Sequence, residues 1–231
     1  MSVIFLIAIF ASYKVRDIFC HKAKWINIRI VITSFNKIYI KRFFGANILK
    51  RSTMFKAFIP FAHAQNIYEI PVDFYKKLGI KVLMMDLDNT LDSYKLFLPT
   101  EKAVKLIEEL KANDIRPIVV SNNRGKRVSS YANALNIEYV SSAKKPFPRV
   151  LNKTIESKGI NRDELLFVGD QMMTDVLATH FAHIRIVLTE KLVKEDQWTT
   201  HINRFFGRFI RRYLRKRNLL KDWREIYGTC S

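Results

Sequence analysis

Short apolar segments alternate with amphipathic ones from residue 81 onward. The short segments are rich in Val and Ile, as strands buried in a parallel sheet are: they cover residues 81–87, 115–121, 137–140, 165–169 and 184–188. The segments between them have helical spacing: they cover residues 100–114, 124–135 and 146–158, with Thr100 as the expected N-cap of the first. This alternation predicts βαβ units with right-handed crossovers. We therefore expect an α/β domain in three layers around a Rossmann-like parallel sheet.

Polar residues that could take part in catalysis or ligand binding lie at the ends of these predicted strands. Asp86 ends the first strand, Ser121 ends the second, and Asp170 directly follows the fourth. In open parallel sheets, ligands bind outside the carboxyl ends of the strands. Residues that are far apart in the sequence should therefore meet at one edge of the sheet and form a site.

The residue types at this edge favour phosphoryl transfer. Clustered carboxylates repel each other unless a cation neutralises them, and an oxygen-rich site is what Mg²⁺ prefers. Asp86 could then attack phosphorus as a nucleophile, and Asp88 could protonate the leaving oxygen and activate water. Ser121 and a lysine would bind the phosphoryl oxygens. Lys145, just before Pro146, is better placed for this than Lys144.

Four segments in order resemble the motifs of haloacid dehalogenase-type (HAD) phosphatases. They are 86-DLDNT-90, Ser121 after a strand, 145-KP-146 and 169-GDQMMTD-175. The resemblance implies that Asp86 is the nucleophile and Asp88 the acid/base. It implies that Mg²⁺ is held by Asp86, Asp170 and the backbone carbonyl of Asp88. It further implies phosphate-binding residues and one supporting residue: Thr90, Ser121, Asn122 and Lys145, with Asp175 in support. By contrast, we expect Asp92 to be a solvated turn residue.

The spacing of the motifs leaves no room for a cap domain. The intervals from Asp86 to Ser121 and from Ser121 to Lys145 are 35 and 24 residues, about one helical crossover each. A capless site is open, which favours a bulky substrate or one presented at a surface.

The chain is most similar to the YqeG-type branch of HAD subfamily IIIA, which resembles mitochondrial phosphatidylglycerophosphate phosphatases. The resemblance rests on residues 54–70, the 121-SNN-123 turn, Thr174-Asp175 and a closing segment at 199–217, and it covers residues 54 to about 217. It departs from the branch at 178-ATHFAH-183, where the family usually has glycines. That difference concerns the conformation of the loop and leaves the chemistry unchanged.

Positive charge is concentrated at the two ends of the chain. The chain has 40 Lys and Arg against 21 Asp and Glu, for a net charge of +19. Of this, residues 1–53 carry +9, residues 201–231 carry +7, and residues 54–200 carry only +3. The surplus suggests an anionic partner: a membrane surface, nucleic acid or a phosphorylated substrate. The predicted divisions are a basic apolar leader (1–53), a phosphatase domain (54–200) and a basic amphipathic C-terminal helix (201–231).

The C-terminal helix has two predicted faces. Its apolar face comprises Ile202, Phe205, Phe206, Phe209, Ile210 and Tyr213. Its basic face comprises Arg204, Arg208, Arg211, Arg212 and Arg215. A helix docked on the domain, a membrane-surface helix and a nucleic-acid-binding helix all fit this pattern.

Residues 1–53 lack a clear helical or strand period, and about 50 residues rarely supply a core of their own. We expect either a natural start at Met54 or a poorly ordered basic leader, with a membrane-associating leader as the alternative. No apolar run reaches the roughly 18 residues needed to span a bilayer. The two cysteines, Cys20 and Cys230, suit a reducing compartment. We expect a cytoplasmic protein, with peripheral binding to the inner face of the membrane as a further expectation.

Two classes of function remain open at this point. The first is an Mg²⁺-dependent phosphomonoester hydrolase that forms an aspartyl-phosphate. Its substrate would be phosphatidylglycerophosphate in phospholipid synthesis, or else a soluble phosphate. The second is a basic RNA- or ribosome-associated protein that retains the HAD fold as a relic. The complete set of nucleophile, acid, lysine and metal ligands favours the enzyme, because a relic would tolerate the loss of any one of them.

Overall fold

A computed structural model of the chain describes residues 55–193 and 201–229. Within them, six strands form one sheet in the order β1-β6-β5-β2-β3-β4, and all neighbouring pairs are parallel. The strands are β1 (Ala62–Ala64), β2 (Val82–Met85), β3 (Arg116–Val120), β4 (Glu138–Val140), β5 (Leu165–Gly169) and β6 (Arg185–Thr189). The predicted parallel sheet is confirmed, and β2 lies near its centre between β5 and β3.

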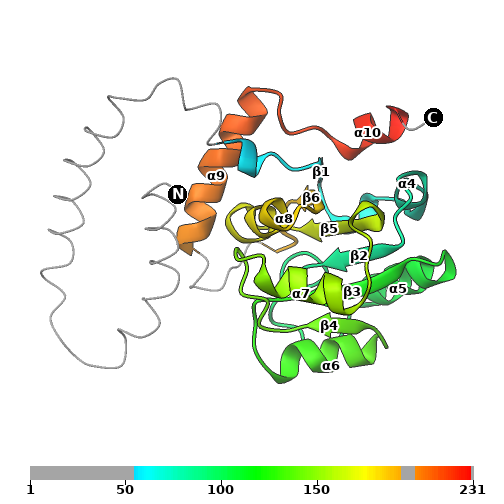
Figure 1. Cartoon of the computed structure of the whole chain (residues 1–231). Coiled ribbons are helices and arrows are strands. Elements are labelled where there is room, and N and C mark those ends of the chain that lie inside the picture. Colours follow the sequence, from blue (N-terminus) through cyan, green and yellow to red (C-terminus); the bar gives the residue numbers. More distant parts are fainter. Residues whose placement is uncertain (1–54, 194–200, 230–231) are drawn as a thin grey trace, which may run out of the picture. The chain divides into compact units, whose positions relative to one another are not determined.

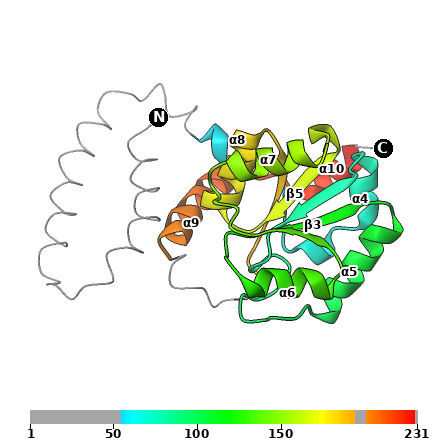
Figure 2. The same cartoon turned by 60° about the horizontal axis from the view of Figure 1, so that its bottom comes forward.

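Helices cover both faces of the sheet. On one face lie α5 (Glu101–Ala112) and α6 (Lys126–Ala134), and on the other lie α7 (Arg149–Ser157) and α8 (Leu177–Ala182) (Figures 1 and 2). The side chain of Thr100 caps α5 by accepting a hydrogen bond from Ala103 N at 3.4 Å, as predicted. The three-layer α/β architecture is confirmed. Only α5 separates β2 from β3 and only α6 separates β3 from β4, so the described residues carry no cap domain at these two positions.

Several short elements fall outside the predicted pattern. They are η2 (Lys56–Phe58), η3 (Ile67–Glu69), α4 (Val72–Lys77), η4 (Arg162–Glu164), the π-helical turn η5 (Met172–Val176) and α10 (Trp223–Thr229). The edge strand β1 is only three residues long, and its two alanines are fully buried against β6. Such a short strand has too few positions to show a period in the sequence.

The core lies between the sheet and the helices. Its largest fully buried side chains are Tyr75, Tyr131, Phe74, Phe167, Ile67, Leu83, Met84 and Met85. All four residues of β2 are buried, because helices cover both of its faces. A strand held this firmly places the residue that follows it, Asp86, at a fixed point on the sheet edge.

The C-terminal helix α9 (His201–Lys216) packs on the domain next to η5. From residue 206 onward, its buried residues are Gly207, Ile210 and Leu214, and Gly207 approaches Met172 closely. Three residues depart from the predicted faces. Phe206 and Phe209 belong to the predicted apolar face but are 42% and 63% exposed. Arg211 belongs to the predicted basic face, but its side chain is only 13% exposed because its guanidinium binds groups at the sheet edge.

The expectations for residues 1–53, including a start at Met54 and a leader, lie outside the described residues. None of the helices that the structure describes combines the length and the apolar character that crossing a bilayer requires.

Candidate active site

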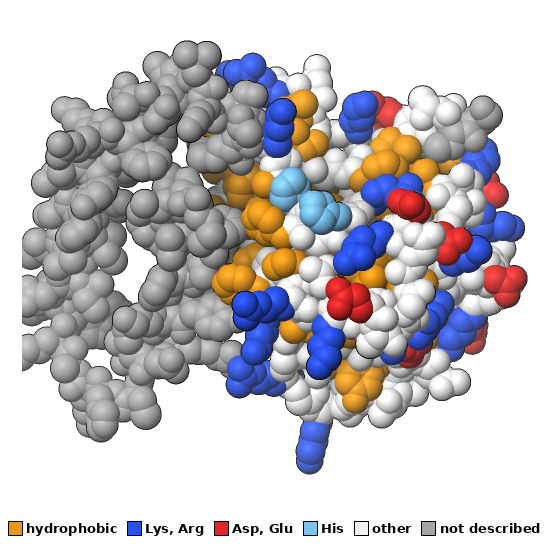
Figure 3. Space-filling view, viewed as in Figure 1, with side chains coloured by type: hydrophobic (Ala, Val, Ile, Leu, Met, Phe, Trp, Pro, Cys, Tyr) orange, Lys and Arg blue, Asp and Glu red, His pale blue; other side chains and the backbone are white. Residues whose placement is uncertain are grey.

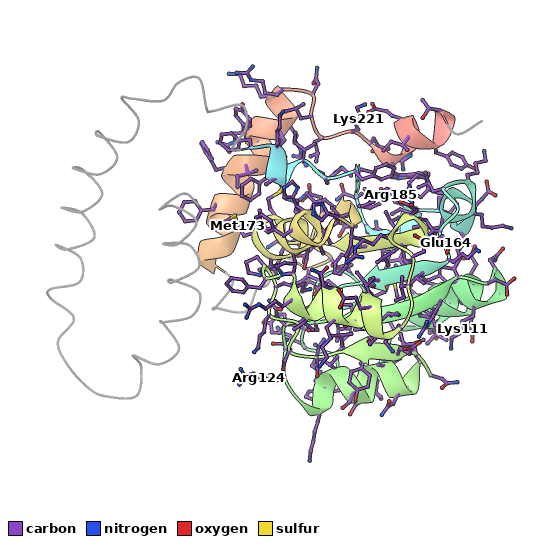
Figure 4. The ribbon with its side chains drawn as sticks, viewed as in Figure 1. Lys111, Arg124, Glu164, Met173, Arg185 and Lys221 are labelled. Carbon is purple, nitrogen blue, oxygen red and sulfur yellow. The ribbon has the colours of Figure 1, made fainter. Side chains whose placement is uncertain are left out.

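The predicted site residues lie at the carboxyl edge of the sheet. Figure 4 shows Arg124 and Met173 at the edge toward which β2 and β5 run, whereas Lys111 and Glu164 lie toward the opposite edge. The loops that follow β2, β3, β4 and β5 therefore supply the candidate residues, as the strand pattern predicts.

Asp86 is held in place at the end of β2. Its backbone N–H donates to Val168 O at 2.9 Å, which ties it to β5. Its carboxylate is buried, and Oδ1 accepts a hydrogen bond from Lys145 Nζ at 2.6 Å. The other oxygen, Oδ2, is also buried and has no hydrogen-bond partner within the part of the chain that the structure describes. A buried anionic oxygen without a partner is costly, which indicates that a ligand belongs beside it.

Lys145 joins two carboxylates. Its Nζ lies 2.8 Å from Asp175 Oδ1 as well as 2.6 Å from Asp86 Oδ1, and it donates to Val120 O at 3.0 Å. Burial alone would lower the pKa of Lys145, but the charges of the two carboxylates outweigh burial and raise it. The amine therefore stays protonated. It is the positive charge that allows these carboxylates to be buried together.

Asn122 fixes the backbone of Lys145. Its side-chain amide donates to Lys145 O at 2.9 Å and accepts from Lys145 N at 2.7 Å. The amide is thus occupied with the main chain of Lys145, which makes Asn122 a support for that lysine. The predicted contact between Asn122 and phosphate stays a prediction.

The π-helical turn η5 places Asp175 under the end of β5. Asp175 N donates to Gln171 O at 2.9 Å, and Gln171 N donates to Asp175 Oδ2 at 3.0 Å. The carboxylate packs directly against Gly169: a Cβ on that glycine would lie 2.6 Å from Asp175 Oδ2. Glycine at position 169 is therefore required by this close approach. π-helical turns of this kind are frequent at functional sites.

Three carboxylates of this edge are suited to hold a divalent cation. Oxygen atoms of Asp86, Asp170 and Asp175 lie within 4.8 Å of one another, and all three residues are buried. Burial raises the pKa of Asp86 well above its ordinary value; Lys145 opposes this shift, and the neighbouring carboxylates add to it. A hard dication among these oxygens would remove the repulsion, so the residues fit Mg²⁺.

The carboxylate of Asp88 is outside this cluster. Its Oδ2 accepts from Asn123 Nδ2 at 2.7 Å and its Oδ1 from Arg127 Nη1 at 2.5 Å. A metal contact from Asp88 would thus come from its backbone carbonyl, as the family resemblance implies, and that contact stays a prediction. With both oxygens engaged, the side chain has a fixed orientation at the mouth of the site.

Arg127 was not among the predicted site residues. Besides Asp88 it binds the backbone of the loop after β2: Nε donates to Leu96 O at 2.8 Å, and Nη2 donates to Ser93 O at 2.9 Å. One signal was available in the sequence. Lys126 and Arg127 begin a helix whose N-terminus disfavours cations, which indicates that they serve another purpose there.

Ser121 and Thr90 are both buried at the same edge. Ser121 Oγ accepts from Asn123 N at 3.1 Å, which shapes the turn after β3. Thr90 Oγ1 is buried and makes no hydrogen bond within the described residues. The structure thus brings both hydroxyl groups to the predicted edge, and their contacts with phosphate stay predictions.

The expectation for Asp92 is wrong. The residue is buried, and its carboxylate accepts from Thr100 N at 3.0 Å and from the Tyr131 hydroxyl at 2.6 Å. Asp92 therefore closes the base of the loop between β2 and α5. The acidic run around it suggested a solvent-exposed turn, and the sequence does not show which partners lie opposite.

Helix α9 reaches the site through Arg211. Its Nη2 donates to Asp170 O at 2.6 Å and to Thr189 O at 2.8 Å, and its Nη1 lies 3.1 Å from Glu190 Oε1. Arg215 Nη2 lies 2.6 Å from the same glutamate oxygen. The backbone of a candidate metal ligand is thus held by the C-terminal helix. No sequence signal distinguishes Arg211 from the other arginines of that helix.

Comparison with known proteins gives one family and one curated relative. The family described as "Haloacid dehalogenase-like hydrolase" matches residues 27–189. "Probable phosphatase YqeG" of Bacillus subtilis (strain 168) is 28% identical over 170 residues, which cover 74% of this chain and 98% of the relative.

Solved structures that resemble the chain do so at low identity. A 3-deoxy-D-manno-octulosonate 8-phosphate phosphatase from Moraxella catarrhalis, in complex with magnesium, phosphate and KDO, is 19% identical with a TM-score of 0.36; the match covers 42% of this chain and 62% of that one. A protein from Listeria monocytogenes is 12% identical with a TM-score of 0.41, covering 58% of this chain and 99% of that one. The chain thus spans about three fifths of the length of the octulosonate phosphatase.

Proposed function

The chain belongs to the haloacid dehalogenase-like hydrolases and is a phosphatase of that family, and from this premise we propose how it acts. It hydrolyses phosphomonoesters with Mg²⁺ through an aspartyl-phosphate at Asp86. The observation that carries the proposal is the state of the Asp86 carboxylate. One oxygen is bound by Lys145, and the other is buried without a hydrogen-bond partner within the described residues. That oxygen is the candidate nucleophile.

In the first half of the reaction, a carboxylate oxygen of Asp86 attacks the phosphorus atom. A new bond forms between that oxygen and phosphorus, and the ester bond to the leaving oxygen breaks. Asp88, oriented by Asn123 and Arg127, gives its proton to the leaving oxygen. The products of this half are the free alcohol and an aspartyl-phosphate at Asp86.

In the second half, Asp88 takes a proton from a water molecule, and the oxygen of that water attacks phosphorus. The bond between phosphorus and Asp86 breaks, so that the carboxylate is restored and inorganic phosphate is released. Asp88 ends the cycle protonated, ready for the next leaving group. Lys145 and Ser121 bind the phosphoryl oxygens in both halves, where charge develops in the transition state.

Asp86, Asp170 and the backbone carbonyl of Asp88 would hold the metal ion, with Asp175 close by in the same carboxylate cluster. When bound, Mg²⁺ would neutralise these oxygens together with those of the phosphoryl group. Asp175 is already paired with Lys145, so its main role is to keep that lysine charged and in place.

The test is hydrolysis of p-nitrophenyl phosphate by the full chain, measured with Mg²⁺ and with EDTA. We expect turnover with Mg²⁺, loss of turnover in EDTA and recovery when Mg²⁺ is restored. Equal rates in EDTA would contradict the metal, and no hydrolysis of this or other monoesters would contradict the phosphatase.

We extend the proposal to a membrane-borne substrate, phosphatidylglycerophosphate or a related lipid monoester, acted on by a cytoplasmic protein at the inner face of the membrane. The site, which has no cap domain between β2 and β3 or between β3 and β4 in the described residues, and the resemblance to phosphatidylglycerophosphate phosphatases support it. Release of phosphate should be faster from lipid monoesters in mixed liposomes than from sugar or nucleotide phosphates. The opposite order would contradict the lipid substrate and leave the phosphatase intact.

The net charge of +19 also favours a second candidate, a basic protein that binds RNA or the ribosome. Co-sedimentation with ribosomes tests it. Retention at 0.5 M salt, together with no hydrolysis of any monoester, would favour this candidate over the enzyme.

A further inference from the structure

The loop between β2 and α5 exposes three consecutive apolar side chains. Leu96 is 38% exposed, Phe97 is 62% exposed and Leu98 is 66% exposed. Single exposed apolar residues are common on protein surfaces, but three in succession form a local patch that water solvates poorly. The patch stands on the loop that begins with Asp86 and Asp88.

This apolar tip has a fixed position beside the site. Arg127 binds the backbone at Ser93 O, ahead of the tip, and at Leu96 O, the first residue of the tip, with the same guanidinium that binds the Asp88 carboxylate. At the base of the loop, the buried carboxylate of Asp92 binds Thr100. The tip is therefore presented at the mouth of the site by the residues that orient the candidate acid.

Among the residues that the structure describes, the exposed charges around the mouth all have one sign. In the described segments 86–99, 121–127, 141–149, 170–176 and 190–193, every acidic side chain is buried or half-buried. The exposed charged side chains of these segments are Lys95, Arg124, Lys126, Lys144, Arg149 and Lys191. In Figure 3, the visible side chains at the edge where β2 and β5 end are mainly orange and blue, and the red ones lie farther toward the other edge.

We propose that this carboxyl edge is a docking surface for an anionic lipid bilayer, in which Phe97 and Leu98 enter the headgroup region and the surrounding cations contact lipid phosphates. Apolar side chains combined with a ring of Lys and Arg are what binds a protein to the surface of an anionic membrane. A surface that binds single-stranded nucleic acid would instead present aromatic side chains that stack on the bases. Two leucines flank Phe97, and aliphatic side chains gain from hydrocarbon and not from base stacking.

The inference deepens the proposed function and rests on it, because docking in this orientation turns the mouth of the candidate site toward the lipid headgroups. A substrate monoester could then reach Asp86 without leaving the bilayer. Binding to vesicles is nevertheless measured without turnover. A failure of docking can therefore be separated from a failure of catalysis.

The experiment is co-sedimentation of the full chain with vesicles of phosphatidylcholine containing 30% phosphatidylglycerol, and with vesicles of phosphatidylcholine alone. The test variant is F97S/L98S. The matched control is F209S, which removes a phenylalanine of equal exposure, 63% against 62%, from α9. Thermal melting of each variant establishes that it is folded, since exposed side chains contribute little to stability.

We expect the wild type to bind the anionic vesicles and to bind the neutral ones on the order of tenfold more weakly. We expect F97S/L98S to lose on the order of tenfold in binding to the anionic vesicles, and F209S to lose much less. Equal binding by F97S/L98S and wild type, or a loss confined to F209S, would overturn the proposal. Binding to single-stranded RNA that depends on Phe97 and Leu98, without vesicle binding, would overturn it in favour of nucleic acid.

A wild-type protein that hydrolyses p-nitrophenyl phosphate but does not bind the anionic vesicles would overturn the docking surface alone. A protein that binds them through Phe97 and Leu98 but hydrolyses no monoester would overturn the phosphatase and leave the docking surface in place.

Discussion

The ion pairs at the two edges of the sheet differ in how deeply they are buried. At the amino edge, ion pairs are at least partly exposed: Arg116 Nε lies 2.5 Å from Glu138 Oε1, and Lys81 Nζ lies 2.9 Å from Glu164 Oε1. At the carboxyl edge, the ion pairs of Lys145 with Asp86 and Asp175 are almost fully buried. Burying charge costs free energy that solvated pairs do not cost. A fold keeps such a cluster where a ligand or a reaction requires it.

A hollow in the surface is a weaker sign of function than this arrangement of charges. The amino edge has a groove of about 350 Å³ lined by residues such as Lys111, Asp114 and Asn136. Of its two carboxylates, Glu138 is already paired with Arg116 and Lys158, and Asp114 is exposed. No partnerless buried carboxylate lines that groove in the described residues, whereas Asp86 Oδ2 is one at the carboxyl edge. The site is therefore located by a buried carboxylate oxygen that has no hydrogen-bond partner in the described residues, and not by the volume of a groove.

The largest expected effect comes from Asp86→Asn, compared with Asp163→Asn at the amino edge. The first substitution keeps the shape of the side chain but removes the anionic nucleophile, so kcat should fall on the order of a thousandfold or more. Asp163 is exposed, and its substitution should leave kcat within about twofold. Hydrolysis of p-nitrophenyl phosphate by purified variants measures both. Near-normal turnover by Asp86→Asn would contradict the assignment of the nucleophile.

The second comparison removes one lysine from each edge. Lys145→Met leaves the buried Asp86 and Asp175 without their counter-charge, and the free energy of unfolding should fall by about 3–5 kcal/mol. Lys158→Met breaks the partly exposed pair with Glu138 and should cost about 0–1 kcal/mol. Urea unfolding in EDTA measures both values. Equal costs would mean that burial does not distinguish the edges.

The third comparison concerns two glycines. In Gly169→Ala, the new Cβ would lie 2.6 Å from Asp175 Oδ2, so the side chain of Asp175 must shift. The free energy of unfolding should fall by about 1–3 kcal/mol. The value of kcat should fall as well, because the shift disturbs the contact between Asp175 and Lys145. At Gly228 a Cβ meets nothing within 4 Å, and Gly228→Ala should change stability by less than about 1 kcal/mol. Thermal melting and steady-state kinetics of both variants test this. A fully active Gly169→Ala would show that the position of Asp175 is unimportant.

The smallest effect is a dependence of stability on pH. At the carboxyl edge, hydrogen bonding to His63 and the charges of Arg211 and Arg215 lower the pKa of Glu190 from 4.5 to about 2, against the opposing effect of burial. A depressed pKa contributes stability above pH 4.5 that is lost as the pH falls toward 2. Glu190→Gln should therefore cost about 1–2 kcal/mol at pH 7 and progressively less below pH 4.5.

Glu138 at the amino edge is the matched control for this pH effect. Arg116 and Lys158 also lower its pKa from 4.5 to about 2, but its side chain is 36% exposed and solvent screens the interaction. Glu138→Gln should show a smaller change in stability between pH 7 and pH 3.5. A larger pH effect at Glu138 than at Glu190 would contradict the role given to burial.

The sheet and the ends of its strands could be predicted from the sequence, because both follow from local patterns. All five predicted strands exist. Four of them, β2, β3, β5 and β6, are mostly buried and leave continuous apolar runs, whereas the edge strand β4 has no buried residue. Asp86, Ser121 and Asp170 meet at one edge because the direction of the strands alone brings them there.

The contacts made by Arg127, Arg211 and Asp92 could not be predicted, because they join distant elements. Arg127 lies 39 positions from Asp88 and Arg211 lies 41 positions from Asp170. Asp92 resembled a solvated residue because its partner Tyr131 comes from another helix. In each case, the local sequence gives the residue type but not the group opposite it.

The central claim is that Asp86 takes up the phosphoryl group, and its most direct test is to locate that group during turnover. The full chain is mixed with Mg²⁺ and a ³²P-labelled monoester, quenched in acid within the first turnovers and digested for mass spectrometry. We predict label on Asp86 in wild-type protein and none in Asp86→Asn. Rapid turnover without labelled protein, or label on a different residue, would contradict the claim.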